Sequence, residues 1–348
     1  MSKKLQIVNI AEAHELDFFQ SIAELIQSAK HNVEKQVNTT MVVTYFEIGR
    51  RIIEKEQQGA KRAQYGKKVL QGLSDYLTAH LGKGYSVDNL KLMRRFYVVY
   101  SAASIGESVI TQFNSNITWT HYVLLMRIEN PDERQFYEIE IANNGWSFRE
   151  FQRQYDTSLY ERLALSRNKK KIRELAMKGQ IVSTPQDLFK DPYVLEFTGL
   201  PEKSEYTETQ LEQKLIDNLQ QFLLELGKGF AFMGRQVRFT YEEESFYVDL
   251  VFYNRLLKCF VLLDLKIGRL KHQDIGQMQM YVNYYDRKIK LHDENPTIGI
   301  VLCRDKKDAM VEMMLPAENK RIFTAKYKTV LPSKEELKKL LKVSIYEP

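Results

Sequence analysis

The chain has 348 residues, with 51 Lys and Arg against 45 Asp and Glu, and a formal net charge of +6. Its content of 44% hydrophobic and 28% charged residues is that of a globular protein and excludes a wholly disordered chain. No stretch approaches the ~18 consecutive apolar residues of a membrane span, and the start lacks the apolar region of a secretory signal. The two cysteines, Cys259 and Cys303, are too few for a disulfide framework or a Cys-based zinc site. We therefore expect a cytoplasmic protein with no membrane partner.

The positive charge is a weak indication of a nucleic-acid partner, because positive surfaces attract polyanions. The 20 Tyr and 18 Phe could stack on bases, although core and interface packing explains most aromatic residues equally well. Composition alone leaves both explanations open.

The first part of the chain, 1–165, has the pattern of a helical domain. Apolar residues recur every three or four positions over 15–38, 39–58 and 66–81, which is the spacing of amphipathic helices. Gly82 predicts the end of the third helix, and Ser86 predicts the cap of a fourth. No strand pattern interrupts them.

A segment rich in Gly and Pro predicts the domain boundary. It begins with a basic run at 167–173, which can be either a solvated helix face or a nucleic-acid contact. We expect a linker at 166–208 and a second domain at 209–348.

The second domain is predicted to be mixed α/β. Its expected elements are a helix at 209–226, strands at 230–241, 246–253 and 259–266, a helix at 274–285 and a strand at 297–303. The order is α-β-β-β-α-β.

An acid and an amine end the third predicted strand. In Asp264-Leu265-Lys266 the two charged residues are two positions apart and share one face of the strand. The preceding residues, Val261 to Leu263, are apolar, as in a strand buried on both faces. Charges in such a place need partners, a metal or solvent.

A second acid belongs to the preceding strand. A hairpin turn centred between Leu256 and Leu257 would place Asp249 directly opposite Asp264. Two carboxylates at that distance repel each other unless a cation lies between them, and Mg²⁺ or Mn²⁺ prefers such oxygen ligands.

This arrangement suits phosphodiester hydrolysis. The metal would activate water, and Lys266 would orient that water and the scissile phosphate. Glu212 on the first helix is a third candidate ligand or else a solvated position, and Gln277 on the second helix could position water or phosphate. The alternative to a metal site is an ordinary surface salt bridge between Asp264 and Lys266.

These residues resemble a known constellation. The element order with Asp249, Asp264-Leu265-Lys266 and Gln277 is similar to the core of the PD-(D/E)XK, or restriction-endonuclease-like, nuclease superfamily. The resemblance implies that Asp249 and Asp264 bind Mg²⁺, that Lys266 assists the water, and that Glu212 and Gln277 contribute. Asp264 stands where Glu is expected to be commoner, and both acids fit the pattern.

Segments along nearly the whole chain resemble the YhcG-like bacterial family. They are residues 45–50, 89–97, 119–122, 146–151, 222–230, 235–236, 248–253 and 276–281. Family membership implies a nuclease domain after an N-terminal helical, winged-helix-like domain. On the helix after Ser86, a polar and basic stripe of Asn89, Met93, Arg94 and Tyr97 has the composition of a recognition helix.

We therefore expect a Mg²⁺-dependent nuclease, acting on DNA, whose N-terminal domain binds nucleic acid or a partner. A catalytically silent DNA-binding or adaptor protein is the first alternative. The second is an assembly module that forms homodimers through the N-terminal domain.

Overall fold

The structure is a computed structural model that describes residues 2–58, 63–101, 113–202, 205–316 and 318–346. Contacts between residues divide the chain into two compact units, Met1–Gln152 and Arg153–Pro348. We call them the helical unit and the sheet unit. No helix in the described ranges is both long enough and apolar enough to cross a membrane.

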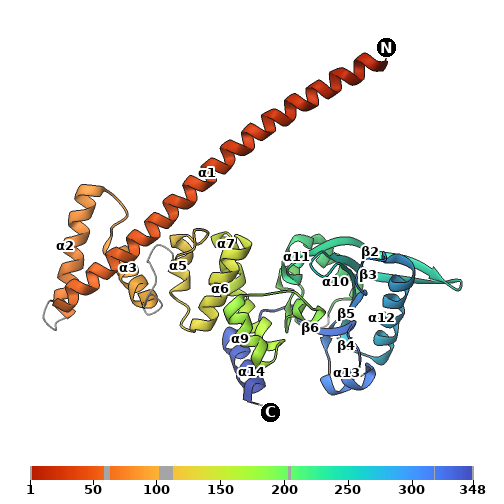
Figure 1. Cartoon of the computed structure of the whole chain (residues 1–348). Coiled ribbons are helices and arrows are strands. Elements are labelled where there is room, and N and C mark those ends of the chain that lie inside the picture. Colours follow the sequence, from red (N-terminus) through yellow and green to blue (C-terminus); the bar gives the residue numbers. More distant parts are fainter. Residues whose placement is uncertain (1, 59–62, 102–112, 203–204, 317, 347–348) are drawn as a thin grey trace. The chain divides into compact units, whose positions relative to one another are not determined.

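The described residues of the helical unit form helices and no strand. The helices are α1 Ser2–Gln58, α2 Ala63–Leu81, α3 Val87–Tyr100, α5 Trp119–Leu125, α6 Pro131–Asn144 and α7 Phe148–Asp156, which ends in the sheet unit. The predicted all-α character is confirmed there, but the strands of a winged-helix domain are not seen in that part of the chain. The two helices expected at 15–38 and 39–58 are one continuous helix (Figure 1). Ser86 caps α3 as predicted, because its side chain accepts a hydrogen bond from the Asn89 N–H.

A close crossing of α1 and α3 forms the core of the helical unit. A Cβ atom at Gly49 would lie 2.1 Å from the backbone oxygen of Met93, so only glycine fits at this position. The rings of Phe46 and Phe96 meet edge to face 5.8 Å apart, and Trp119 packs on Phe96 at 5.3 Å. Aromatic contacts of this kind add to the free energy gained from burying apolar area.

The predicted recognition stripe on α3 is engaged within the unit. Met93 is buried, and the Asn89 side chain donates a hydrogen bond to the backbone oxygen of Gly84. Arg94 forms an ion pair with Glu56 at 2.9 Å. The structure therefore presents these residues as packing and capping groups.

The apolar stripe of α1 extends beyond this core. Over residues 18–37, several large apolar side chains are exposed, with Leu25 66% and Val33 61% accessible. The sequence pattern indicated an amphipathic helix, and the structure leaves this part of its apolar face uncovered in a single chain.

The sheet unit is a six-stranded mixed sheet with helices. Its helices are α8 Leu159–Leu165, α9 Lys169–Lys178, α10 Glu208–Asp217, α11 Leu219–Leu226, α12 His272–Tyr284, α13 Asp308–Met314 and α14 Lys334–Tyr346, with short turns η2 Pro185–Leu188, η3 Glu196–Thr198 and η4 Tyr285–Ile289. Its strands are β1 Tyr193–Val194, β2 Phe230–Tyr241, β3 Glu244–Asn254, β4 Cys259–Arg269, β5 Ile298–Asp305 and β6 Ile322–Lys328. The mixed α/β class and the predicted α-β-β-β-α-β order are confirmed, with the first helix divided at Asn218 into α10 and α11.

The sheet order is β1-β6-β5-β4-β3-β2. Strands β2, β3 and β4 are antiparallel neighbours, whereas β4, β5, β6 and β1 run parallel. The β2–β3 pair forms a long ribbon (Figure 1). The sequence pattern did not predict β1, β6, α13 or α14.

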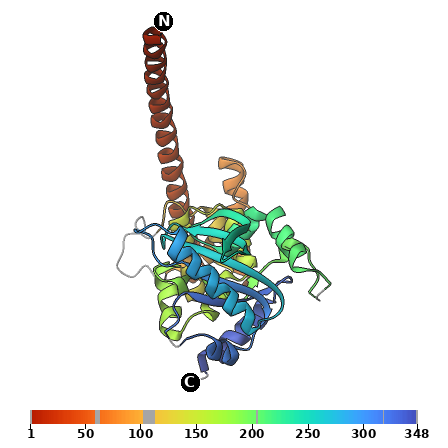
Figure 2. The same cartoon turned by 90° about the vertical axis from the view of Figure 1, so that its right-hand side faces the viewer.

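Each face of the sheet carries its own core. Leu211 of α10 and Phe222 of α11 pack with Leu263 and Leu265 of β4. On the other face, Met278 and Tyr281 of α12 pack with Leu262 of β4, and α12 can be followed across the sheet in Figure 2. Because Leu263 and Leu265 face α10 and α11, the alternation of a strand directs Asp264 toward the α12 face.

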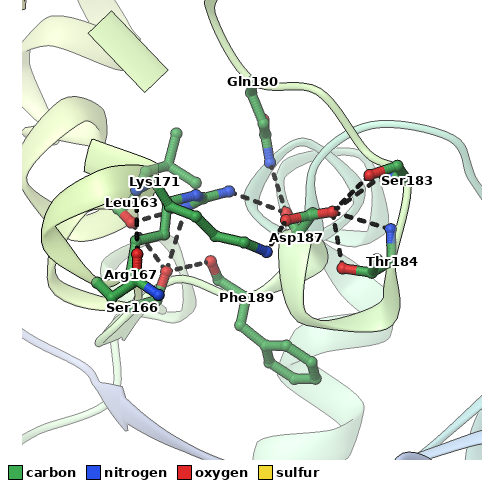
Figure 3. A network of polar contacts seen from close by, with 10 residues as sticks. Leu163, Ser166, Arg167, Lys171, Gln180, Ser183, Thr184, Asp187 and Phe189 are labelled. Carbon is green, nitrogen blue, oxygen red and sulfur yellow. Dashed lines mark hydrogen bonds and ion pairs between the residues drawn. The ribbon is translucent and has the colours of Figure 1, made fainter. Parts of the chain in front are cut away.

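The segment 166–208, expected as a linker, contains α9, η2, β1 and η3. Within it, Asp187 organises a polar network (Figure 3). Asp187 Oδ2 accepts hydrogen bonds from the backbone and side chain of Thr184, both at 2.8 Å, and from those of Ser183. Lys171 of α9 lies 3.1 Å from Asp187 Oδ1, so the network ties α9 to η2.

A buried charged cluster joins α8 to α11. The Arg162 guanidinium is fully buried and binds both carboxylate oxygens of Glu225. Lys190 lies 3.6 Å from the same carboxylate, which also accepts the Val194 N–H at 2.9 Å. Removing one member of such a cluster leaves an unpaired buried charge, which is strongly destabilising.

Candidate active site

The predicted acids lie where the β3–β4 ladder ends. Pairing runs from Asn254↔Cys259 to Leu250↔Leu263, which is the register predicted from the turn, and Asp249 and Asp264 are the next residues on the two strands. Asp249 Oδ2 accepts a hydrogen bond from the Leu265 N–H at 2.8 Å. This carboxylate is therefore fixed against the backbone of β4, one residue from Asp264.

Asp264 is the most buried member of the site. It is 2% exposed, and Lys266 Nζ lies 2.9 Å from its Oδ2. Apart from this ion pair, the buried Oδ2 has no hydrogen-bond partner. Burial, and then the nearby Asp249 carboxylate, raise the pKa of Asp264 to about 7, although Lys266 acts in the opposite direction.

Lys266 stays protonated at neutral pH in this environment. Burial acts to lower its pKa, but the carboxylates of Asp264 and Glu208 outweigh burial and raise the pKa of Lys266. Glu208, at the start of α10, lies 3.8 Å from Lys266 Nζ. The ammonium group is thus held at the end of β4 as a fixed positive charge.

Glu212 comes from α10 and is 7% exposed. It connects to Asp249 through Gln236 of β2, whose Nε2 donates to Glu212 Oε2 at 2.7 Å and to Asp249 Oδ1 at 3.0 Å. Burial, and then the Asp249 carboxylate, raise the pKa of Glu212, although the bond from Gln236 opposes this. The structure therefore brings Glu212, Asp249, Asp264 and Lys266 to one end of the sheet.

Gln236 was not predicted as a site residue. Its backbone lies in the left-handed region, with φ 46°, which is uncommon for a residue other than Gly, Asn or Asp. The flanking pairs Arg235↔Leu250 and Val237↔Val248 place it across from Asp249. Strained backbone conformations often occur at functional sites. The isolated Gly234 inside the strand is a sequence signal for the irregular register between Phe232 and Gly234, whereas the left-handed conformation of Gln236 has none.

The structure does not bring Gln277 into a hydrogen bond with the described acids of the site. Its side chain donates to the Tyr281 hydroxyl one turn further along α12. Burial, and then the charges of Asp264 and Asp249, raise the pKa of Tyr281, although the bond from Gln277 opposes this. Gln277 is therefore linked to Tyr281, whose hydroxyl is influenced by the charges of Asp264 and Asp249.

The carboxylates suit a hard divalent cation in donor chemistry. Asp249, Asp264 and Glu212 offer only oxygen atoms, which Mg²⁺ and Mn²⁺ prefer, and among the described residues the buried Asp264 Oδ2 has only the Lys266 ammonium as a partner. Within the described ranges, no three His, Cys, Asp or Glu side chains are already grouped as a metal-binding cluster. The Gln236 amide bridges Glu212 and Asp249, and Lys266 neutralises Asp264, so these contacts would rearrange around a bound ion.

Comparison with protein families divides the chain into two matched regions. A family described as "YhcG PDDEXK nuclease domain" matches residues 186–342, which contain all the acids of the site. A family described as "DUF1016 N-terminal domain" matches residues 21–162.

A relative similar over nearly the whole length comes from Escherichia coli (strain K12). It is named "Putative nuclease YhcG" and is 37% identical over 341 residues, covering 91% of this chain and 90% of the relative.

Two solved structures resemble part of the chain. A repair endonuclease from Pyrococcus abyssi has 17% identity and a TM-score of 0.26, covering 37% of this chain and 50% of that chain. EndoMS in its apo form has 15% identity and a TM-score of 0.25, covering 38% of this chain and 49% of that chain.

Proposed function

Because the chain belongs to the YhcG family, whose second region is a PDDEXK nuclease domain, we propose that it hydrolyses phosphodiester bonds in nucleic acid with a divalent metal ion. DNA is the substrate we expect, and Mg²⁺, or Mn²⁺, is the expected ion. Asp249, Asp264 and Glu212 would hold the metal. The observation that carries the proposal is the buried Asp264 carboxylate, with Lys266 at 2.9 Å and Asp249 fixed beside it.

The metal would supply an activated water and neutralise charge on the phosphoryl oxygens. The Lys266 ammonium would hold the attacking water and the scissile phosphate in one orientation, since its charge is fixed by Asp264 and Glu208. Gln236 would keep the Glu212 and Asp249 carboxylates at a constant separation. Gln277 would act through Tyr281 as a positioning residue.

The test is cleavage of plasmid, linear and branched DNA by the full-length chain, with Mg²⁺ or Mn²⁺ titrated against a chelator. Asp264→Asn keeps the size of the side chain and removes its charge. We expect cleavage to fall by about 100-fold or more, since several kcal/mol of transition-state stabilisation is lost. Lys266→Met should have a similar effect.

Asp217→Asn is a matched control on the same helix. Asp217 ends the helix that carries Glu212 and is exposed, so this variant should cut at the wild-type rate. Cleavage by Asp264→Asn at the wild-type rate would contradict the proposed role of Asp264 in the active site. DNA binding with no cleavage under any metal or substrate would instead support a silent adaptor.

We further propose that the helical unit forms a homodimer through α1. The exposed apolar positions of α1 match in part when the helix is reversed: an antiparallel copy would place Phe18 opposite Val37 and Ile22 opposite Val33. A contiguous exposed apolar surface of this kind supports an interaction site. Binding of nucleic acid by the helical unit stays part of the proposal, although the stripe on α3 does not support it.

The cysteines agree with the proposed reducing compartment. Cys259 and Cys303 are both free and buried, in strands β4 and β5. Burial, and then nearby carboxylates, raise the pKa of Cys259 to about 12, so the thiol is unreactive at neutral pH.

A further inference from the structure

A cleft of about 520 Å³ opens beside the proposed catalytic residues. Its wall is formed by the ends of the parallel strands β4, β5 and β6 and by Glu202 and Tyr206, which precede α10 in the chain. The lining residues that matter here are Tyr206, Gly268, Arg269, Arg304, Asp305 and Tyr327. In open α/β sheets, the carboxyl ends of the strands are where ligands bind.

The lining of the cleft follows the site along β4. Its lining begins at Ile267, the residue after Lys266, and continues through Gly268 and Arg269. Two residues of an extended strand span ~7 Å, so Gly268 is one short step from Lys266. A strand whose phosphate lies at Lys266 would therefore have its neighbouring nucleotide at the cleft.

Among the described residues that line the cleft, one cationic side chain makes no ion pair. Arg269 pairs with Asp305 at 3.4 Å, and Lys328 pairs with Glu202 at 3.8 Å. Arg304 donates a hydrogen bond to the backbone oxygen of Glu202 and makes no ion pair with any described residue. Its guanidinium can therefore bind a phosphate without displacing a carboxylate.

The remaining lining suits the uncharged part of a nucleotide. Tyr206 and Tyr327 are buried, with their hydroxyl oxygens 3.4 Å apart. Both tyrosines line the cleft together with Ile267. A space of this volume lies within the ~300–1,000 Å³ of sites that enclose one small ligand. A base inside a duplex is stacked and paired, and enters such a pocket only when it is unpaired.

We infer that the cleft receives an unpaired nucleotide adjacent to the scissile phosphate, so that the substrate is nucleic acid with a single-stranded segment beside a duplex. This inference rests on the proposed nuclease function. Arg304 binds the phosphate of that nucleotide, and the tyrosine hydroxyls contact its sugar or base.

The test measures binding of the full-length chain in EDTA, so that cleavage plays no part. Three fluorescein-labelled probes share one sequence: a blunt duplex, the same duplex with a four-nucleotide single-stranded extension at one end, and the same duplex with that extension at the other end. We expect one extended probe to bind about tenfold more tightly than the blunt duplex, as cationic and stacking contacts to one nucleotide allow.

Two variants probe the cleft itself. A side chain at Gly268 meets no atom within 4 Å, so Gly268→Met fills the cleft without a clash. Gly268→Met and Arg304→Gln should each lower the affinity for the extended probe to that for the blunt duplex. Gly276→Met is the matched control, because Gly276 on α12 is equally open and lies outside the cleft.

The inference is overturned if the extended probes and the blunt duplex bind equally tightly, or if no probe binds. It is also overturned if the cleft variants still bind an extended probe more tightly than the blunt duplex. Each of these results can coexist with Asp264-dependent cleavage, in which case the proposed function stands. Conversely, the cleft variants could abolish the preference for the extended probe while Asp264→Asn leaves cleavage unchanged. That result would support the nucleotide-binding cleft and contradict the proposed catalytic site.

Discussion

At the scale of single residues, Gln236 combines a strained backbone with two bonds to carboxylates. The left-handed φ of 46° costs of order 1 kcal/mol for such a residue, whereas glycine adopts it freely. The same conformation directs the amide between Glu212 and Asp249. Glycine at this position would therefore favour stability, whereas the glutamine amide favours activity.

Gln236→Gly should raise the free energy of unfolding by about 1 kcal/mol and lower cleavage by about 10- to 100-fold. Urea denaturation and initial cleavage rates measure the two effects. Glu243→Gly is the control, because Glu243 also has a positive φ, 67°, but lies at the tip of the β2–β3 ribbon. It should gain similar stability and keep full activity. An active Gln236→Gly would show that the amide does not position the acids.

Asp187 predicts a pH dependence of stability. Burial acts to raise its pKa, but bonds from Thr184, Lys171 and Ser183 outweigh burial and lower the pKa of Asp187 to about 2. The unfolded-state pKa is ~3.9. Because the folded value is depressed, the stabilisation is complete above about pH 4 and is lost as the pH falls toward 2.

Asp187→Asn should therefore lower the free energy of unfolding by about 1–2 kcal/mol at pH 7, the range for losing a side-chain cap. The difference from the wild type should shrink steadily between pH 4 and pH 2. Urea denaturation followed by circular dichroism across this range measures it. A constant difference at all pH values would contradict the role of the ionised carboxylate.

At the scale of elements, Gly49 sets how closely α1 and α3 approach. A methyl group at this position would collide with the backbone oxygen of Met93, so Gly49→Ala should destabilise the helical unit by about 1–3 kcal/mol. At Gly72 in α2 a Cβ meets nothing within 4 Å, and Gly72→Ala should stabilise by about 0.5–1 kcal/mol.

Tryptophan fluorescence isolates this effect. The only two tryptophans, Trp119 and Trp146, lie in the helical unit. Their urea transition should move to lower urea in Gly49→Ala and to higher urea in Gly72→Ala. Equal transitions in the two variants would mean that α1 and α3 do not cross as described.

The sheet and its acids could be predicted from the sequence because they depend on local patterns. The apolar run before Asp264 predicts a buried strand, and the turn at Leu256 and Leu257 sets the register that leads to Asp249. Gln236 could not be predicted as a site residue, since no sequence pattern indicates a left-handed residue at this place in β2, although the regular register from Tyr241↔Glu244 places it opposite Asp249. The strand β1 has two residues and no periodicity of its own, so only its pairing with Tyr327 and Lys328 defines it.

At the scale of the whole molecule, the uncovered part of α1 determines the expected assembly. Ile26→Glu with Val33→Glu places charges in the middle of the proposed helix pair, and the mass measured by light scattering should fall from that of a dimer to that of a monomer. Ser28→Glu adds a charge at an exposed position away from Ile26 and Val33, and should leave the mass unchanged. A monomeric wild type at micromolar concentration would contradict the dimer.

The buried pair of Arg162 and Glu225 has a consequence for dividing the protein. Arg162 is the last residue matched by the first family region, whereas Glu225 belongs to the second, which starts at residue 186. A fragment cut at the family boundary would leave Glu225 and Lys190 in an apolar interior without the guanidinium that neutralises them. The bounds of the matched family regions therefore differ from the bounds of the folded unit. A fragment meant to carry the nuclease domain alone must begin before α8.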